Sequence, residues 1–362
     1  MKEFNKKMKR YICQYHNPHL ERIGRIFDFI FLKLMFKKNL KDLHEELFSK
    51  ILIFESHLIG DCVMTTALIK NIRNQYPYAQ IDILSNSWML QIVNPEVINN
   101  IYSVNVPWSR YNYSIKNIFH FFFTIIKLRK KNYDLAIETR GEIRNNFVLF
   151  LTAAKRRLGI DMAGGTFLLT DSITLDLKPT LAEKRMFLLK KLGITYEEFM
   201  PDIFIPKNDL IKVTQFLSEN KIFENDYILF HPGGSNPQKS FLVNEIIDLR
   251  KRFSNYNFVI AYGPNERETI KLLSQELKPQ IYNGKTLFFS NTISAFAEMA
   301  RKSLVTITME SGPAHISSAL EAKCFVIFAH DKPDYVKPLG KRVTMVDFEN
   351  LDILESLIKN SH

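Results

Sequence analysis

Apolar, largely β-branched runs alternate with helix-like stretches from about residue 51 onward, and this alternation limits the fold more than any other feature. A repeated strand–helix pattern predicts a parallel sheet with helices on both faces. In the first series we expect strands at residues 51–54, 80–84, 101–106 and 134–138, with helices at 61–75, at 115–128 and after Gly141.

A second series begins near Tyr227. The segment 199–208, which contains Pro201 and Pro206, connects the two series. The chain is therefore predicted to be an α/β protein of two Rossmann-like, doubly wound domains with a cleft between them. In such sheets ligands bind at the carboxyl ends of the strands. The expected strands of this series are 227–230, 257–261, 304–308 and 324–329. Helices are expected to begin near Phe241, Asn265 and Ile293, and a last helix is expected at 350–359.

The composition, with 46% hydrophobic and 24% charged residues, is that of a soluble globular protein. Cys13, Cys62 and Cys324 are far apart, which fits neither a disulfide framework nor a zinc site and favours a reducing cytosol. The formal charge is +11, and residues 1–50 hold twelve Lys/Arg against six Asp/Glu. Such a surface attracts nucleic acid, phospholipid headgroups or a phosphorylated glycolipid, and no nucleic-acid-binding motif accompanies it.

The N-terminal 49 residues include an apolar stretch, 26–36, that is interrupted by Asp28 and Lys33. It is far shorter than the roughly 20 residues that span a bilayer, and no signal peptide is predicted. Two interpretations stand equally: a basic helix lying in the membrane interface, or a helix packed on the body of the protein. A surface-bound cytoplasmic protein fits both.

The segment 304–320 predicts a strand that ends at Glu310 and a helix that opens at Ser311-Gly312-Pro313. Proline suits the first helical turn, and the exposed amides and the helix dipole at that end attract an anion such as a diphosphate. His315 follows beside this anion site. A histidine that only packs in the core is the alternative.

Residues that follow two further predicted strands could belong to the same anion-binding site. After residue 230 the amides of Gly233, Gly234 and Ser235 are placed to cradle phosphate oxygens, and Lys239 supplies a positive charge for a leaving diphosphate. The spacing is not that of a Walker A loop, which disfavours ATP hydrolysis. After residue 261, Glu266 is a candidate for the ribose hydroxyls. The alternatives are a Gly-Pro connection with an exposed lysine, and an acid in an ordinary helix start.

The first domain offers its own candidates. Asp61 follows the first strand and is either a general base for an attacking hydroxyl or the N-cap of a helix. His57 competes with it for the role of base. Arg140 and Arg144 follow residue 138 and either hold an anionic acceptor or are solvated surface arginines.

In combination and order these motifs resemble glycosyltransferase family 9, the bacterial lipopolysaccharide heptosyltransferases, over roughly residues 50–340. The resemblance rests on three segments in addition to that of Ser311 to His315: 59–61 with Thr65-Thr66, 231–235 with Lys239, and 263–266. The segment 157–160 also resembles the acceptor domain of the family. Glu310 stands where the family usually has aspartate, so its carboxylate reaches about one methylene further.

The resemblance implies a GT-B fold and an inverting, metal-independent transfer of a heptose from ADP-heptose to a Kdo or heptose of the lipopolysaccharide inner core. No DxD motif is present. It implies Asp61 as catalytic base and Lys239 as stabiliser of the diphosphate. Donor-binding residues would be Gly233, Gly234, Ser235, Glu266, Glu310, Ser311, Gly312 and His315, and we expect acceptor binding by Arg140, Arg144 and His57.

The expected domains are a basic aromatic extension (1–49), an acceptor domain (50–205), a nucleotide-sugar domain (206–345) and a C-terminal helix (346–362). The expected partners are the donor, a lipid A–core oligosaccharide acceptor and the anionic inner-membrane surface, without cofactor, metal or nucleic acid. Two rival functions stay open: another nucleotide-sugar enzyme of the same fold, such as an epimerase, and a basic membrane- or nucleic-acid-binding protein with a degenerate site.

Overall fold

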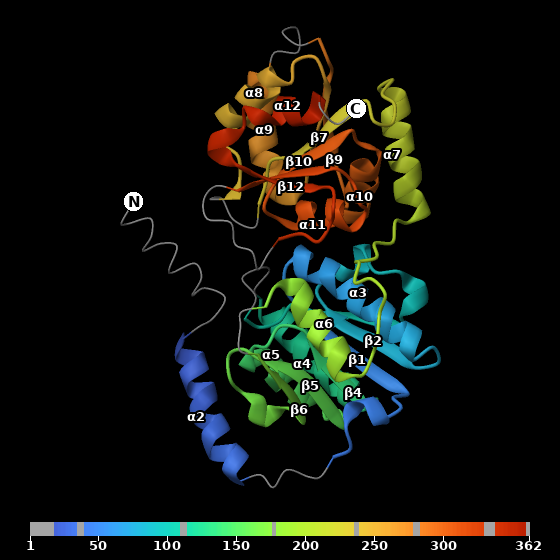
Figure 1. The fold of residues 1–362 in the computed structure, drawn as a ribbon, viewed down its shortest axis with the longest axis vertical. Coiled ribbons are helices and arrows are strands. Elements are labelled where there is room, and N and C mark those ends of the chain that lie inside the picture. Colours follow the sequence, from blue (N-terminus) through green and yellow to red (C-terminus); the bar gives the residue numbers. More distant parts are fainter. Residues whose placement is uncertain are drawn as a thin grey trace. The chain divides into compact units, whose positions relative to one another are not determined.

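The computed structural model describes residues 18–34, 40–108, 114–175, 179–234, 239–277, 283–328 and 337–359. Within these residues the chain forms two compact units (Figure 1). Unit 1 comprises the described residues of Met1–His57, Ala67–Leu90 and Pro95–Phe199, and unit 2 those of Leu58–Thr66, Gln91–Asn94 and Met200–His362.

Unit 1 is built on a parallel sheet of six strands in the order β3-β2-β1-β4-β5-β6. The chain builds the sheet outward from β1 in one direction and then from β4 in the other, so the topological switch point lies between β1 and β4. In such sheets ligands bind at the carboxyl ends of the strands near this point. The strands are β1 (Lys50–Glu55), β2 (Gln80–Ser85), β3 (Asn100–Ser103), β4 (Leu135–Glu138), β5 (Arg156–Asp161) and β6 (Asp171–Thr174).

Two helices of unit 1, α4 and α6, begin at polar caps. The hydroxyl of Ser114 accepts a hydrogen bond from the Asn117 amide at the start of α4, and Thr180 and Glu183 form a capping box at the start of α6. Inner residues of α4 and α5 share one core with the sheet. The helices are α2 (Pro18–Leu34), α3 (Ile59–Gln75, whose first turns belong to unit 2), α4 (Ile115–Arg129), α5 (Ile143–Thr152) and α6 (Leu181–Lys191).

Unit 2 has a second parallel sheet of six strands, in the order β12-β11-β10-β7-β8-β9. Its strands are β7 (Tyr227–His231), β8 (Asn257–Tyr262), β9 (Thr286–Ser290), β10 (Val305–Met309), β11 (Cys324–Phe328) and β12 (Val343–Asp347). Its helices are α7 (Lys207–Glu219), α8 (Val243–Arg252), α9 (Arg267–Glu276), α10 (Ile293–Lys302), α11 (Gly312–Ala319) and α12 (Ile353–Lys359).

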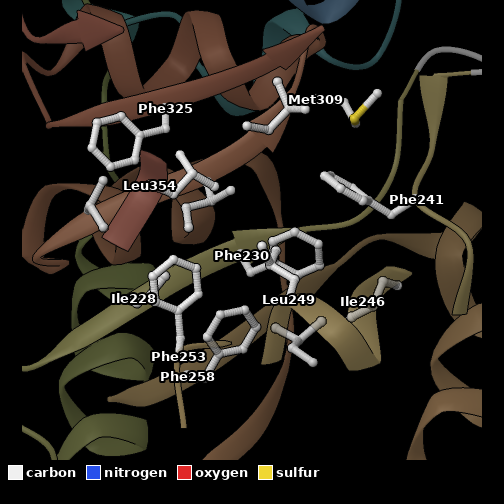
Figure 2. Packing of buried hydrophobic residues seen from close by; sticks show 14 of the residues in the cluster. Ile228, Phe230, Phe241, Ile246, Leu249, Phe253, Phe258, Met309, Phe325 and Leu354 are labelled. Carbon is white, nitrogen blue, oxygen red and sulfur yellow. The ribbon is translucent and has the colours of Figure 1, made fainter. Parts of the chain in front are cut away.

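One face of this second sheet packs against α8, α9 and α12. Figure 2 shows the aromatic centre of this core, where Phe230 of β7 meets Phe241 and Phe258. The ring centroids of Phe230 lie 5.2 Å from Phe241 and 5.5 Å from Phe258. The Phe241 amide also donates a hydrogen bond to the Pro232 carbonyl oxygen at 2.9 Å, so the ring packing holds the backbone directly after β7.

The predicted α/β fold with two doubly wound sheets is confirmed, but four of the twelve strands formed by the described residues were not expected from the sequence. Three of them, β6, β9 and β12, are edge strands whose side chains are mostly half-exposed or exposed, so they lack a continuous apolar run. The fourth, β5, contains Arg156, whose guanidinium is paired with Glu46 and Asp171. Helices α6 and α7 were also not expected.

The N-terminal helix α2 packs on unit 1. Its Arg25 is paired with Asp161 at 2.7 Å, and buried Asp28 accepts hydrogen bonds from Gly165, Thr166 and Phe167 at 2.8–2.9 Å. These contacts agree with the interpretation of this segment as a helix packed on the protein, at least for its inner face. Residues 35–36 of the predicted stretch lie outside the described residues.

Among the helices that the structure describes, none has the length and hydropathy needed to cross a bilayer.

Candidate functional site

In unit 2, Gly233 and Glu266 come together at the carboxyl ends of β7 and β8. A Cβ at Gly233 would lie 2.2 Å from Glu266 Oε1, so glycine is needed for the carboxylate to lie against the backbone. Glu266 ends a short 3₁₀ helix (Pro264–Glu266), and its Oε2 accepts a hydrogen bond from the Gly263 amide at 2.8 Å. Two residues predicted to bind the donor are therefore neighbours.

His231, the last residue of β7, lies beside the same carboxylate. Burial lowers the pKa of His231, although the negative charge of Glu266 opposes this shift. Its Nδ1 is 3.3 Å from the Gly233 amide. A neutral imidazole at this position favours a role in shaping the loop rather than in supplying charge.

Lys239 and Glu310 form an ion pair that links the β7 and β10 ends, with Lys239 Nζ 3.3 Å from Glu310 Oε1. Burial raises the pKa of Glu310, and the charge of Lys239 works against that shift. Gly234 lies directly against Lys239, because a Cβ there would be 2.0 Å from the Lys239 carbonyl oxygen. Ser235, the third predicted residue of this loop, lies outside the described residues.

The predicted helix after β10 is present as α11, with Pro313 in its first turn. Ser311 precedes it and donates a hydrogen bond from its hydroxyl to the Met309 carbonyl oxygen at 3.1 Å. His315 is buried, and a Cβ at Gly60 would lie 2.6 Å from His315 Cδ2. A Cβ at Gly312 would likewise lie 2.8 Å from Ile59 Cβ. The start of α11 therefore contacts residues 58–66, which belong to the same unit.

Asp61 lies in that stretch and is buried. The N-cap interpretation of Asp61 is wrong, because α3 already begins at Ile59 and the Cys62 amide donates to the Leu58 carbonyl oxygen at 3.1 Å. Asp61 is instead a residue of the first helical turn, where a carboxylate is stabilised by the positive end of the helix dipole. Helix capping therefore does not explain why an aspartate stands at position 61.

In unit 1, the three residues predicted to bind the acceptor converge on one carboxylate, Glu142, at the start of α5. Arg140 Nε is 3.2 Å and His57 Nε2 is 3.6 Å from Glu142 Oε1, while Arg144 Nη2 is 2.7 Å from Oε2. The interpretation of Arg140 and Arg144 as solvated surface arginines is therefore incorrect for Arg140, which is buried, whereas Arg144 is part-buried.

A second carboxylate, Glu55 at the end of β1, holds the other side of His57. His57 Nδ1 is 3.0 Å from Glu55 Oε1, and Arg185 Nη2 of α6 is 2.7 Å from Glu55 Oε2. Burial alone would raise the pKa of Glu55, but the hydrogen bond from His57 and the charge of Arg185 lower it instead. Burial and Arg140 would lower the pKa of His57, but its hydrogen bonds to Glu142 and Glu55 raise it.

Sequence reasoning missed Glu142, Glu55 and Arg185 as members of this cluster. Glu142 lies between Arg140 and Arg144, the two arginines that the sequence predicts for acceptor binding, so its position in the sequence is a usable signal. The sequence contains no such signal for Arg185. An arginine on a helix is ordinarily exposed to solvent, and Arg185 is buried only because of the fold.

Among the residues that the structure describes, no group of three or more His, Cys, Asp or Glu side chains is arranged to hold a metal ion. The polar groups collected at the β7, β8 and β10 ends are glycine amides, one lysine and two carboxylates. This set suits a ligand that has both an anionic part and hydroxyl groups.

Two parallel six-stranded sheets, each covered by helices and each with polar residues at its strand ends, are the architecture of the GT-B fold. Solved structures of this fold include "E. coli heptosyltransferase WaaC with ADP" (TM-score 0.68, 15% identity, 86% of this chain and 100% of that one). A glycosyl transferase family 9 protein from Veillonella parvula gives a TM-score of 0.71 at 18% identity, over 89% of this chain and 92% of that one.

The sequence itself matches "Glycosyltransferase family 9 (heptosyltransferase)" over residues 124–356, and the chain belongs to this family. Relatives include lipooligosaccharide heptosyltransferase 2 of Haemophilus influenzae, 22% identical over 327 residues, with 82% of this chain and 88% of the relative covered. Lipopolysaccharide heptosyltransferase 2 of Escherichia coli is 23% identical, with 82% and 87% covered. The predicted family is confirmed, and the protein is a glycosyltransferase.

Proposed function

We propose that this protein transfers a heptose from ADP-heptose to a Kdo or heptose of the lipopolysaccharide inner core, with inversion and without a metal ion. The observation that most supports the proposal is the family match over residues 124–356, which includes the whole cluster of Gly233, Lys239, Glu266 and Glu310. Relatives named as heptosyltransferases of lipopolysaccharide over 82% of the chain add to it.

In the proposed reaction a hydroxyl oxygen of the acceptor attacks the anomeric carbon of the donor while the bond from that carbon to the diphosphate oxygen breaks. Asp61 accepts the proton of the attacking hydroxyl, and ADP leaves with the electron pair of the broken bond. Lys239 stabilises the negative charge that develops on the leaving diphosphate. Glu266 accepts hydrogen bonds from the ribose hydroxyls.

The ion pair between Lys239 and Glu310 implies an exchange of partners when the donor binds. The diphosphate takes over the lysine, and the Glu310 carboxylate then accepts hydrogen bonds from hydroxyls of the donor sugar. Glu310 is buried and its pKa is raised, so a charged Glu310 carboxylate without hydrogen-bond partners would cost free energy. Glu310 is therefore the proposed determinant of which sugar is accepted.

On the acceptor side we propose that Arg140, Arg144 and His57 bind an anionic group of the inner core. Their shared partner Glu142 keeps them in place in the absence of acceptor. The lipid anchor of such an acceptor places the proposed reaction at the cytoplasmic face of the inner membrane.

The test is the substitution Asp61→Asn, which keeps the shape of the side chain and removes the base. We expect transfer to fall by about 10²- to 10⁴-fold while ADP binding is unchanged, because a general base acts in the transition state and not on the bound nucleotide. Transfer is followed by mass spectrometry of an inner-core acceptor with ADP-heptose, and binding by calorimetry.

The matched control is Asp248→Asn, an exposed aspartate of α8 that pairs only at the surface with Lys251. It should leave both readouts at the wild-type level. Full turnover by Asp61→Asn would remove this residue from the mechanism. Turnover with a different nucleotide sugar, and none with ADP-heptose, would replace the proposed donor.

A further inference from the structure

Exposed apolar side chains concentrate on three helices of unit 1. About half of the exposed large hydrophobic residues in the described part of the chain lie on α2, α4 and α5. The most exposed include Phe29 on α2 at 65%, and Phe119 and Phe123 on α4 at 60% and 68%. Single exposed apolar residues are normal, but such a concentration on neighbouring elements marks an interaction surface.

The three helices are linked in unit 1, because α5 contacts both α4 and α2. Phe27 of α2 stacks in tilted geometry on Phe167 at 6.0 Å, which ties α2 to the segment beside α5. We call the outward side of α2, α4 and α5 the apolar layer.

Packing within unit 1 explains only the inward side of α4. Phe121, Ile125 and Leu128 point into the core beneath the sheet. Phe119, Phe122 and Phe123 are exposed, so α4 carries aromatic side chains on a second side in addition to the buried one. Aromatic side chains gathered on the exposed side of a helix suit an apolar partner.

The charge around the apolar layer is positive. Neither α4 nor α5 contains an acidic residue, and Lys116, Lys127, Arg129 and Lys130 are exposed along α4 and just after it. On α2, Asp28 is turned inward and bonded to residues 165–167, and Glu21 in the first turn is the one other acidic residue of the helix. An apolar surface bordered by cations complements anionic headgroups above acyl chains, whereas two copies of this surface would bring like charges together.

We propose that the apolar layer docks on an anionic phospholipid bilayer, with the aromatic side chains of α2 and α4 inserted at the headgroup boundary and the lysines on lipid phosphates. The choice of a bilayer as partner rests in part on the proposed function, whose acceptor is lipid-anchored. The docking surface itself rests on the exposure and charge of the three helices.

The experiment is co-sedimentation of the full-length chain with phosphatidylglycerol–phosphatidylcholine vesicles, compared with the double variant Phe119→Ser/Phe123→Ser. We expect the wild type to pellet with these vesicles, less at high salt and much less with pure phosphatidylcholine. The double variant should bind about tenfold more weakly, because two exposed aromatic rings no longer enter the interface. Phe223→Ser is the control, since Phe223 is 75% exposed in unit 2 and should have no effect.

A wild type that stays in the supernatant, or a double variant that pellets equally well, would overturn the proposal. So would a dimer in sedimentation velocity that the double substitution converts to a monomer, because the layer would then cover a second copy. Transfer to a deacylated, soluble acceptor separates this proposal from the proposed function. The double variant should retain that activity, whereas failure of the wild type to transfer heptose would contradict the function and leave vesicle binding standing.

Discussion

Gly233 and Gly234 are adjacent glycines that the structure needs for different reasons. A Cβ at Gly233 would overlap the end of the Glu266 side chain, which is able to rotate away. A Cβ at Gly234 would overlap the backbone of Lys239, which is not able to move without distorting the loop. A substitution at Gly233 should therefore affect ligand binding alone, whereas one at Gly234 should also affect folding.

For Gly233→Ala we expect ADP to bind about tenfold more weakly, because Glu266 leaves its position and loses the hydrogen bond from the Gly263 amide. The melting temperature should change little. For Gly234→Ala we expect a loss of about 1–3 kcal/mol of stability, typical of overpacking, together with loss of ADP binding. Calorimetric titration and thermal unfolding measure both. Wild-type ADP affinity in Gly233→Ala would remove Glu266 from the donor site.

At the scale of elements, His57 joins the end of β1 to the start of α5 through Glu55 and Glu142. The pKa of His57 is raised from 6.5, so its ionised form adds stability that is complete below pH 6.5 and is lost as pH rises through the raised pKa. The pKa of each carboxyl is lowered from 4.5, so their contribution is complete above pH 4.5 and lost on acidification.

The stabilising effect of this link should therefore be largest between pH 4.5 and 6.5. We expect the melting temperature of the wild type to exceed that of His57→Gln in this window, and the difference to shrink as pH rises above it. Differential scanning calorimetry of both proteins across the range is the measurement. A difference that grows toward alkaline pH would show that the neutral ring, not the ionised one, is the stabilising form.

Most of the strands that sequence patterns predicted are inner strands, because a strand covered on both faces is a continuous apolar run. Edge strand β3 is the exception, since it was expected although none of its residues is buried. All five residues of β10 and of β11 are buried, and both strands were expected. Edge strand β6 has no buried residue and was not expected. Likewise β5 was not expected, since Arg156 is acceptable in a strand only with the ion partners that the fold brings to it.

At the scale of the whole molecule, each unit has its own sheet and its own hydrophobic core. A nucleotide that binds only the strand ends of unit 2 should therefore stabilise that unit selectively. We expect ADP to slow hydrogen exchange at residues 231–234, 263–266 and 310–315. Exchange in β5 and β6 should stay unchanged. Mass-spectrometric exchange with and without ADP tests this, and equal protection of both sheets would contradict the assignment of the nucleotide to unit 2.

The sequence alone determined the parallel α/β class, most of the inner strands and the glycine, lysine and carboxylate positions at the strand ends, because these follow from local periodicity and turn chemistry. Only the tertiary structure decided that His57, Arg140 and Arg144 share Glu142, and that Arg185 neutralises Glu55. The latter two residues are 130 positions apart, and their pairing depends on burial that no local pattern encodes. The same holds for α4, whose two apolar sides look alike in the sequence until the sheet covers one of them.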